Sequence, residues 1–172
     1  MAKKEREVPE EATEMTCEDQ GFVDEETDFD VEEEYKPTPL VPKSTYHAFI
    51  TEVSDNKEAA SIDFTCTFQD NGGIMSDGET QIDGSTIKKR VFLPKPGDDQ
   101  ERTKSGKMTK RQAKINMMRD FAEGMKINMN NLSVIRTAID NSEWIGLSVT
   151  LKVDIREYQG RFSNDIVTMV MA

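Results

Sequence analysis

The residues best suited to chemistry in this sequence are cations, and they gather between positions 88 and 119. That stretch holds eleven Lys and Arg residues against three acidic ones, a net charge of +8. Several cations along one groove can neutralise successive phosphates of a nucleic acid and release its condensed counterions. Solubilising charge on a loop or a helix face gives the same pattern. We favour nucleic-acid binding because the stretch is so poor in acidic residues while the rest of residues 37–172 is acidic.

Aromatic residues lie close to these cations in the sequence. Phe92 follows the triplet at positions 88–90, and Tyr158 and Phe162 flank a predicted turn together with Arg156 and Arg161. Proteins that bind single strands stack bases on such rings, each worth ~1–3 kcal/mol. Four other rings are more typical of core packing: Phe49, Phe64, Phe68 and Trp144. The predicted nucleic-acid-binding residues are Lys88, Lys89, Arg90, Phe92, Lys95, Lys104, Lys107, Lys110, Arg111, Lys152, Arg156, Tyr158, Arg161 and Phe162.

Catalytic chemistry has little support in the sequence. It contains no Gly-rich phosphate loop, no HExxH or GxSxG motif and no Cys/His nucleophile pair. Four carboxylates could in principle hold Mg²⁺, but the last three fall in predicted turns, where Asp serves as a turn residue; they are Asp63, Asp70, Asp77 and Asp83. The single histidine, His47, is expected to be a packing or surface residue. We therefore predict a protein that is not an enzyme and has no cofactor or metal.

Charge is divided sharply along the chain. Residues 1–36 contain four basic and fifteen acidic residues, net −11, whereas residues 37–172 are neutral overall. So acidic a segment, with only isolated apolar residues, is typical of disorder. Pro37, Pro39 and Pro42 then indicate an extended linker. The predicted organisation is an acidic disordered tail with a Pro-rich linker at residues 1–42 and one domain at residues 43–172.

The acidic tail has several possible roles that the sequence leaves open. Its carboxylates could imitate a nucleic-acid backbone and fold back onto the basic stretch. They could also present a docking peptide to replication or recombination proteins, or simply solvate the chain.

Hydrophobic periodicity predicts the elements that must position these residues. Alternating patterns indicate strands at residues 46–53, 62–69, 86–93, 145–156 and 161–171. Helical spacing indicates a helix from a Thr109 cap to about Met125, with Gly124 available for its C-terminal cap, and a shorter helical turn at 132–139. Three strands, a helix and two strands are the element order of an OB-fold, a five-stranded β-barrel with its helix between strands three and four. Other five-stranded barrels and a partly open sheet share this order.

The setting predicted from the sequence is the cytoplasm, of the host cell if the protein is phage-encoded. There is no signal-peptide pattern and no apolar run of membrane-spanning length. The two cysteines, Cys17 and Cys66, form neither a CxxC pair nor a disulfide framework, which fits a reducing compartment. We therefore expect no membrane partner.

A block near the C-terminus resembles a known family. Residues 144–153, beginning Trp-Ile-Gly-Leu, and residues 157–164, Glu-Tyr-Gln-Gly-Arg-Phe-Ser-Asn, are similar to small phage-encoded single-stranded-DNA-binding OB-fold proteins of replication and recombination modules. The similarity covers roughly residues 46–170 in element order. It implies a non-catalytic single-stranded DNA-binding protein in phage-type replication or recombination. The acidic leader differs from the better-known bacterial single-strand-binding proteins, whose acidic docking tail is C-terminal.

Two other functions compete with this one. The first is a protein-interaction module whose acidic tail docks on a replication partner, such as a polymerase or helicase, or blocks a host DNA-binding protein. The second, ranked well behind, is a small metal-dependent nuclease that would use Asp77 and Asp83. The sequence leaves the preference for DNA or RNA and the oligomeric state open.

Overall fold

A computed structural model of the chain describes residues 30–172. The chain divides into two compact units, Met1–Pro37 and Thr38–Ala172. The described part of the first unit contains one short helix, α1 (Val31–Glu34), whose first turn is capped by the carboxylate of Asp30. The rest of the predicted acidic tail, residues 1–29, lies outside the described residues. No helix within residues 30–172 is long and apolar enough to cross a membrane.

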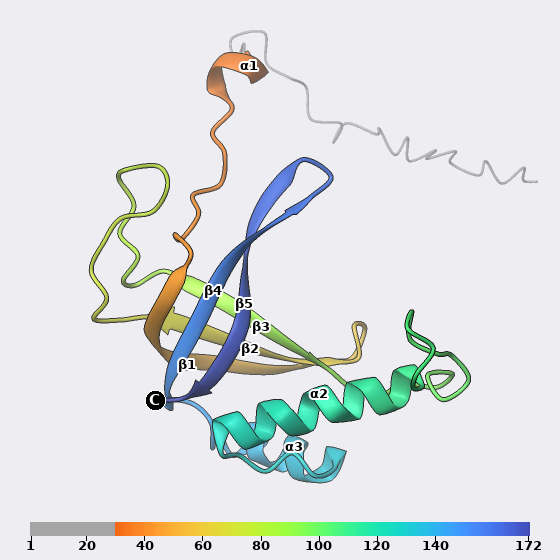
Figure 1. The fold of residues 1–172 in the computed structure, drawn as a ribbon. Coiled ribbons are helices and arrows are strands. Elements are labelled where there is room, and N and C mark those ends of the chain that lie inside the picture. Colours follow the sequence, from red (N-terminus) through yellow and green to blue (C-terminus); the bar gives the residue numbers. More distant parts are fainter. Residues whose placement is uncertain (1–29) are drawn as a thin grey trace, which may run out of the picture. The chain divides into compact units, whose positions relative to one another are not determined.

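The second unit is mainly β. Its elements are β1 (Ser44–Asn56), β2 (Ser61–Phe68), β3 (Thr86–Phe92), α2 (Lys110–Met125), α3 (Leu132–Asp140), β4 (Ser148–Tyr158) and β5 (Arg161–Met171). All neighbouring strands are antiparallel, in the order β3-β2-β1-β4-β5 (Figure 1). The predicted helix between the third and fourth strands is confirmed.

The sheet is open, so the closed form of the predicted barrel is wrong. Within residues 38–172 no backbone ladder joins β3 to β5, although parts of the two strands lie near each other. One side-chain hydrogen bond links the two strands instead: Lys89 Nζ of β3 donates to the carbonyl oxygen of Ile166 of β5, 3.0 Å away. The strands therefore approach without exchanging backbone hydrogen bonds.

The core lies between the sheet and the two longer helices. The alternating residues of β2 that the sequence placed inside, from Ile62 to Phe68, are all buried. The ring of Phe64 lies 5.0 Å from that of Phe121 on α2 and 5.6 Å from that of Trp144, which precedes β4. Aromatic contacts at these distances add to the stability that burial of the rings supplies. They attach α2 and the segment after α3 to the sheet.

Two details near element ends differ from the predictions. β4 begins at Ser148 rather than at 145, because Gly146 turns the chain with φ +83° and leaves Ile145 exposed. The C-cap of α2 is Lys126, in the left-handed conformation, and not Gly124. Gly124 lies inside the helix, where a Cβ would meet Val170 Cγ1 at 3.2 Å. Its lack of a side chain lets α2 approach β5 closely.

The compact unit begins before the predicted boundary at residue 43. Val41 is buried, and its backbone N–H and C=O both bond the side-chain amide of Asn164 on β5, at 2.8 and 2.7 Å. The hydroxyl of Tyr46 donates to the carbonyl of Pro42 at 2.6 Å. The last residues of the predicted linker are therefore bonded to the sheet.

Candidate nucleic-acid interface

The cationic triplet on β3 is divided between the two faces of the sheet. Successive side chains of a strand point to opposite faces. Lys88, Arg90 and Phe92 are exposed on the outer face, whereas Lys89 and Val91 face inward. Phe92 retains 46% of its accessible surface. The structure therefore places two of the three predicted cations on the same face of β3 as the predicted stacking ring.

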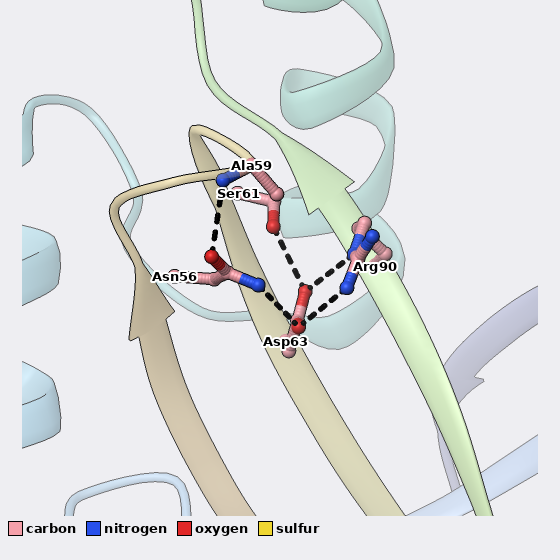
Figure 2. A network of polar contacts seen from close by, with 5 residues as sticks. All are labelled: Asn56, Ala59, Ser61, Asp63 and Arg90. Carbon is pink, nitrogen blue, oxygen red and sulfur yellow. Dashed lines mark hydrogen bonds and ion pairs between the residues drawn. The ribbon is translucent and has the colours of Figure 1, made fainter. Parts of the chain in front are cut away.

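Arg90 is tied to a carboxylate on the neighbouring strand. Its Nε and Nη2 atoms donate to the two oxygens of Asp63 at 3.0 and 3.1 Å (Figure 2). Ser61 Oγ and Asn56 Nδ2 also donate to this carboxylate, at 2.9 and 3.5 Å. Burial alone would raise the pKa of Asp63. The three side-chain hydrogen bonds together outweigh burial and lower this pKa below its usual value, and the bond from Arg90 contributes most among them. The charge of Arg90 is thus balanced within the protein.

Lys89 connects two strands instead of facing solvent. Its ammonium donates to the Ile166 carbonyl, and burial lowers the pKa of Lys89. Asp165 on β5 raises this pKa and Arg156 on β4 lowers it, both more weakly. This position gives no support to the predicted role of Lys89 in nucleic-acid binding.

A groove of ≈ 300 Å³ lies where β3, β5 and α2 meet. Its walls are mostly apolar, with Phe92 and Val91 from β3 and Met117 and Phe121 from α2 among the lining residues. Lys89, Arg90 and Lys114 supply cations at the groove, and Asp120 supplies one carboxylate. The groove was not predicted from the sequence, because the α2 residues that line it have a pattern typical of ordinary helix packing.

The loop between β3 and α2 and the first turns of α2 carry several cations, and two of those on α2 are paired with carboxylates of the loop. Lys110 forms an ion pair with Glu101. Lys114 Nζ lies 2.7 Å from Asp98, a buried carboxylate that also accepts from the backbone N–H of Lys95. The hydrogen bond from Lys114 is the main reason that the pKa of Asp98 is lowered. Four predicted ligands of this loop and of the start of α2 are exposed and form no ion pair within residues 30–172: Lys95, Lys104, Lys107 and Arg111.

β4 and β5 form a hairpin that projects as an arm (Figure 1). Its turn residues, Gln159 and Gly160, both have positive φ, at 51° and 75°, as a tight two-residue hairpin requires. Tyr158 opposes Arg161 on one face, with 74% of its surface exposed. Phe162, 58% exposed, opposes Glu157 on the other face. The expected exposure of Tyr158 is confirmed, but the two rings do not share a face.

The structure therefore does not gather the predicted residues into one patch. Figure 1 shows the tip of the hairpin arm and α2 at opposite ends of the sheet. Between them, Arg156 pairs with Asp165 at 2.9 Å. Lys152 is exposed farther along β4, on the outer face. There are two candidate regions, one around the β3–α2 groove and its basic loop, the other on the hairpin arm.

The carboxylates that a nuclease would need are engaged in local structure. Asp83 accepts the backbone N–H groups of Asn71 and Gly72, and Asp77 accepts hydrogen bonds from Thr80 and Glu79. These bonds lower the pKa of both carboxyls, with Asn71 the main cause for Asp83 and Thr80 for Asp77. Within residues 30–172 no three His, Cys, Asp or Glu side chains are grouped to hold a metal ion.

The surroundings of His47 and Cys66 are those of residues that pack within the fold. The Nε2 atom of His47 shares a hydrogen bond with Ser148 Oγ at 2.7 Å, and its ring meets Phe49 edge-on. Cys66 is buried in the core, where burial raises the pKa of its thiol to about 12. A thiol with so high a pKa is a poor nucleophile at neutral pH.

Comparison of the chain with models of known protein families gives no match, and comparison with curated protein sequences gives none either.

Proposed function

We propose that the protein binds single-stranded DNA without acting as an enzyme, in phage-type replication or recombination in the cytoplasm of a host cell. The observation that carries this proposal is the groove between β3, β5 and α2. It combines an exposed aromatic ring with apolar walls, and exposed cations lie outside it on β3 and in the loop that follows β3. Sequence-tolerant binders of single strands use this combination, stacking bases on rings while cations follow the backbone.

One residue of the groove and several cations outside it have roles in this proposal. Phe92 offers its exposed ring to a base. Lys88, on the same face four residues earlier, lies about 13 Å away along the strand and is placed to meet a phosphate. Beyond Phe92, the loop that leads to α2 supplies the exposed cations Lys104 and Lys107 for further phosphates. The strand of DNA would thus run along β3 toward the loop.

We propose further that the sheet is a partly open OB-like barrel. Its strand order, the helix between β3 and β4 and the approach of β3 to β5 support this interpretation. OB-folds bind oligonucleotides on the face of strands two and three and with the loop between strands four and five. In this chain that face carries Lys88 and Phe92, and the β4–β5 turn carries Tyr158.

Fluorescence anisotropy of a labelled oligo-dT with the full chain tests the proposal. We expect binding at low salt that weakens as salt is raised, because phosphate contacts release counterions. Phe92→Ala should weaken binding by roughly tenfold, the loss of one stacked base. Tyr35→Ala is the matched control, since this exposed ring lies in the other compact unit. No binding at low salt, or equal losses from both variants, would contradict the proposal.

A further inference from the structure

A second and larger groove, ≈ 770 Å³, lies between α2 and α3. It uses a different face of α2 from the first groove. Ile115, Met118 and Ala122 line it at helical spacing, and Leu132 and Ile135 of α3 form the opposite wall. Residues three and four apart lie on one face of a helix, so these side chains form a continuous aliphatic surface. Leu132 retains 41% of its accessible surface.

The edge of this groove is positively charged. Arg111, Arg119 and Lys126 line it, against the single carboxylate of Glu123. Glu123 is already paired with Arg119 at 3.2 Å. Arg111 and Lys126 form no ion pair with any residue between 30 and 172.

The start of α3 adds to this positive edge. Its N-cap, Asn131, and its first residue, Leu132, both line the groove. The N-terminus of a helix carries a partial positive charge from its unpaired N–H groups. The groove therefore has aliphatic walls and an excess of positive charge around them.

We propose that this groove docks an acidic peptide segment with apolar anchor residues, supplied by a partner protein. Carboxylates of the segment would meet Arg111 and Lys126, and its apolar side chains would cover Leu132, Ile115 and Met118. Binding of an apolar peptide face in a groove between helices is a common recognition mode. The volume is in the range of grooves that enclose side chains or small ligands.

The chemistry of the lining distinguishes a peptide from a nucleic acid. The first groove contains the rings of Phe92 and Phe121, whereas no aromatic residue lines the second. A base entering the second groove would find no ring on which to stack. Aliphatic side chains of a peptide are complementary to its walls, and the proposal is independent of DNA binding in the first groove.

The experiment uses a fluorescein-labelled synthetic peptide with Leu and Phe three and four residues apart among Asp and Glu, titrated with the full chain. We expect binding at low salt. A peptide with Ser in place of Leu and Phe, and one with Asn and Gln in place of Asp and Glu, should each bind more weakly. Equal binding of all three peptides would overturn the proposal, as would no binding of the first.

Two variants locate the binding site. Leu132→Ser should weaken peptide binding about tenfold at any salt concentration, because an apolar contact is lost. Lys126→Glu should weaken it roughly threefold at low salt and less at high salt, where exposed charges are screened. Lys152→Glu, the same charge change on β4, should leave peptide binding unchanged.

Oligo-dT separates this proposal from DNA binding. Leu132→Ser should bind oligo-dT as the unmodified chain does, so a failure of one activity is distinguishable from a failure of the other. Unchanged peptide binding by Leu132→Ser would overturn the proposal. So would full displacement of the peptide by oligo-dT together with loss of oligo-dT binding in Leu132→Ser, which would assign the groove to nucleic acid.

Discussion

The Nζ atom of Lys89 on β3 lies 3.0 Å from the carbonyl oxygen of Ile166 on β5, at the edge where the sheet is open. Lys88, its neighbour in the sequence, is exposed on the opposite face of β3. Two adjacent cations thus have different surroundings: one bridges two strands, and the other faces solvent beside the proposed path of DNA.

We expect these two lysines to respond differently to substitution. Lys88→Gln should weaken oligo-dT binding at low salt and reduce the salt dependence by about one counterion, with stability unchanged. Lys89→Met should leave the Ile166 carbonyl without its donor and lower the free energy of unfolding by about 1–3 kcal/mol. Urea denaturation and oligo-dT titration of both variants measure these effects. The same loss of affinity in both, with stability unchanged in both, would contradict the assignment.

The buried carboxylate of Asp63 should matter for stability. Asp63→Asn removes the charge that holds Arg90 and weakens the network of Figure 2, so we expect the free energy of unfolding to fall by about 1–3 kcal/mol. Asp165→Asn is the matched control. It breaks the more exposed pair with Arg156, and such pairs contribute about 0–1 kcal/mol. Comparable losses in the two variants, measured by urea denaturation, would argue against a special role for Asp63.

The same carboxylate should make stability depend on pH. Folding lowers the pKa of Asp63, so the folded protein binds this proton less tightly than the unfolded chain does. The stabilisation is therefore complete above the unfolded pKa, about 4, and is lost as pH falls through the lower folded value. In unfolding measurements across this range, the difference between the unmodified chain and Asp63→Asn should shrink as pH decreases. A constant difference would show that ionisation of Asp63 contributes nothing.

The hairpin arm allows a test of which face meets DNA. Tyr158 shares its face with Arg156 and Arg161, whereas Phe162 lies on the face of Glu157. We expect Tyr158→Ala to weaken oligo-dT binding by roughly five- to tenfold, because stacking and phosphate contacts can act together on its face. Phe162→Ala should have a smaller effect. The reverse order, in anisotropy titrations, would place DNA on the other face of the arm.

Removal of residues 1–36 should raise the apparent affinity for oligo-dT. These residues carry a charge of −11, and tethering keeps that charge near the basic stretch at high local concentration. The increase should be largest at low salt and should shrink as salt screens the carboxylates. Titration of both chains over a range of salt concentrations measures it. An affinity that does not change with the deletion would leave these residues as a spacer or as a ligand for another protein.

Local patterns were sufficient to predict most of the elements. The alternation in β2 and the Thr109 cap of α2 identified those elements closely, because burial of one strand face and satisfaction of the first helical N–H groups are local requirements. The start of β4 was misjudged because the alternation continues through Ile145, while the turn at Gly146 is not visible as a break in that pattern.

The candidate site, like the fold, could be predicted only in part from local patterns. The sequence by itself determined that charge is concentrated in the basic stretch and that Tyr158 follows a run typical of a strand, since these depend on composition and period. Only the tertiary structure decided which of these cations are paired within residues 30–172. Whether Arg90 meets Asp63, or Lys89 meets Ile166, depends on strand register and on how near β3 comes to β5. These are long-range relationships, set by packing of the whole sheet, and no local pattern encodes them.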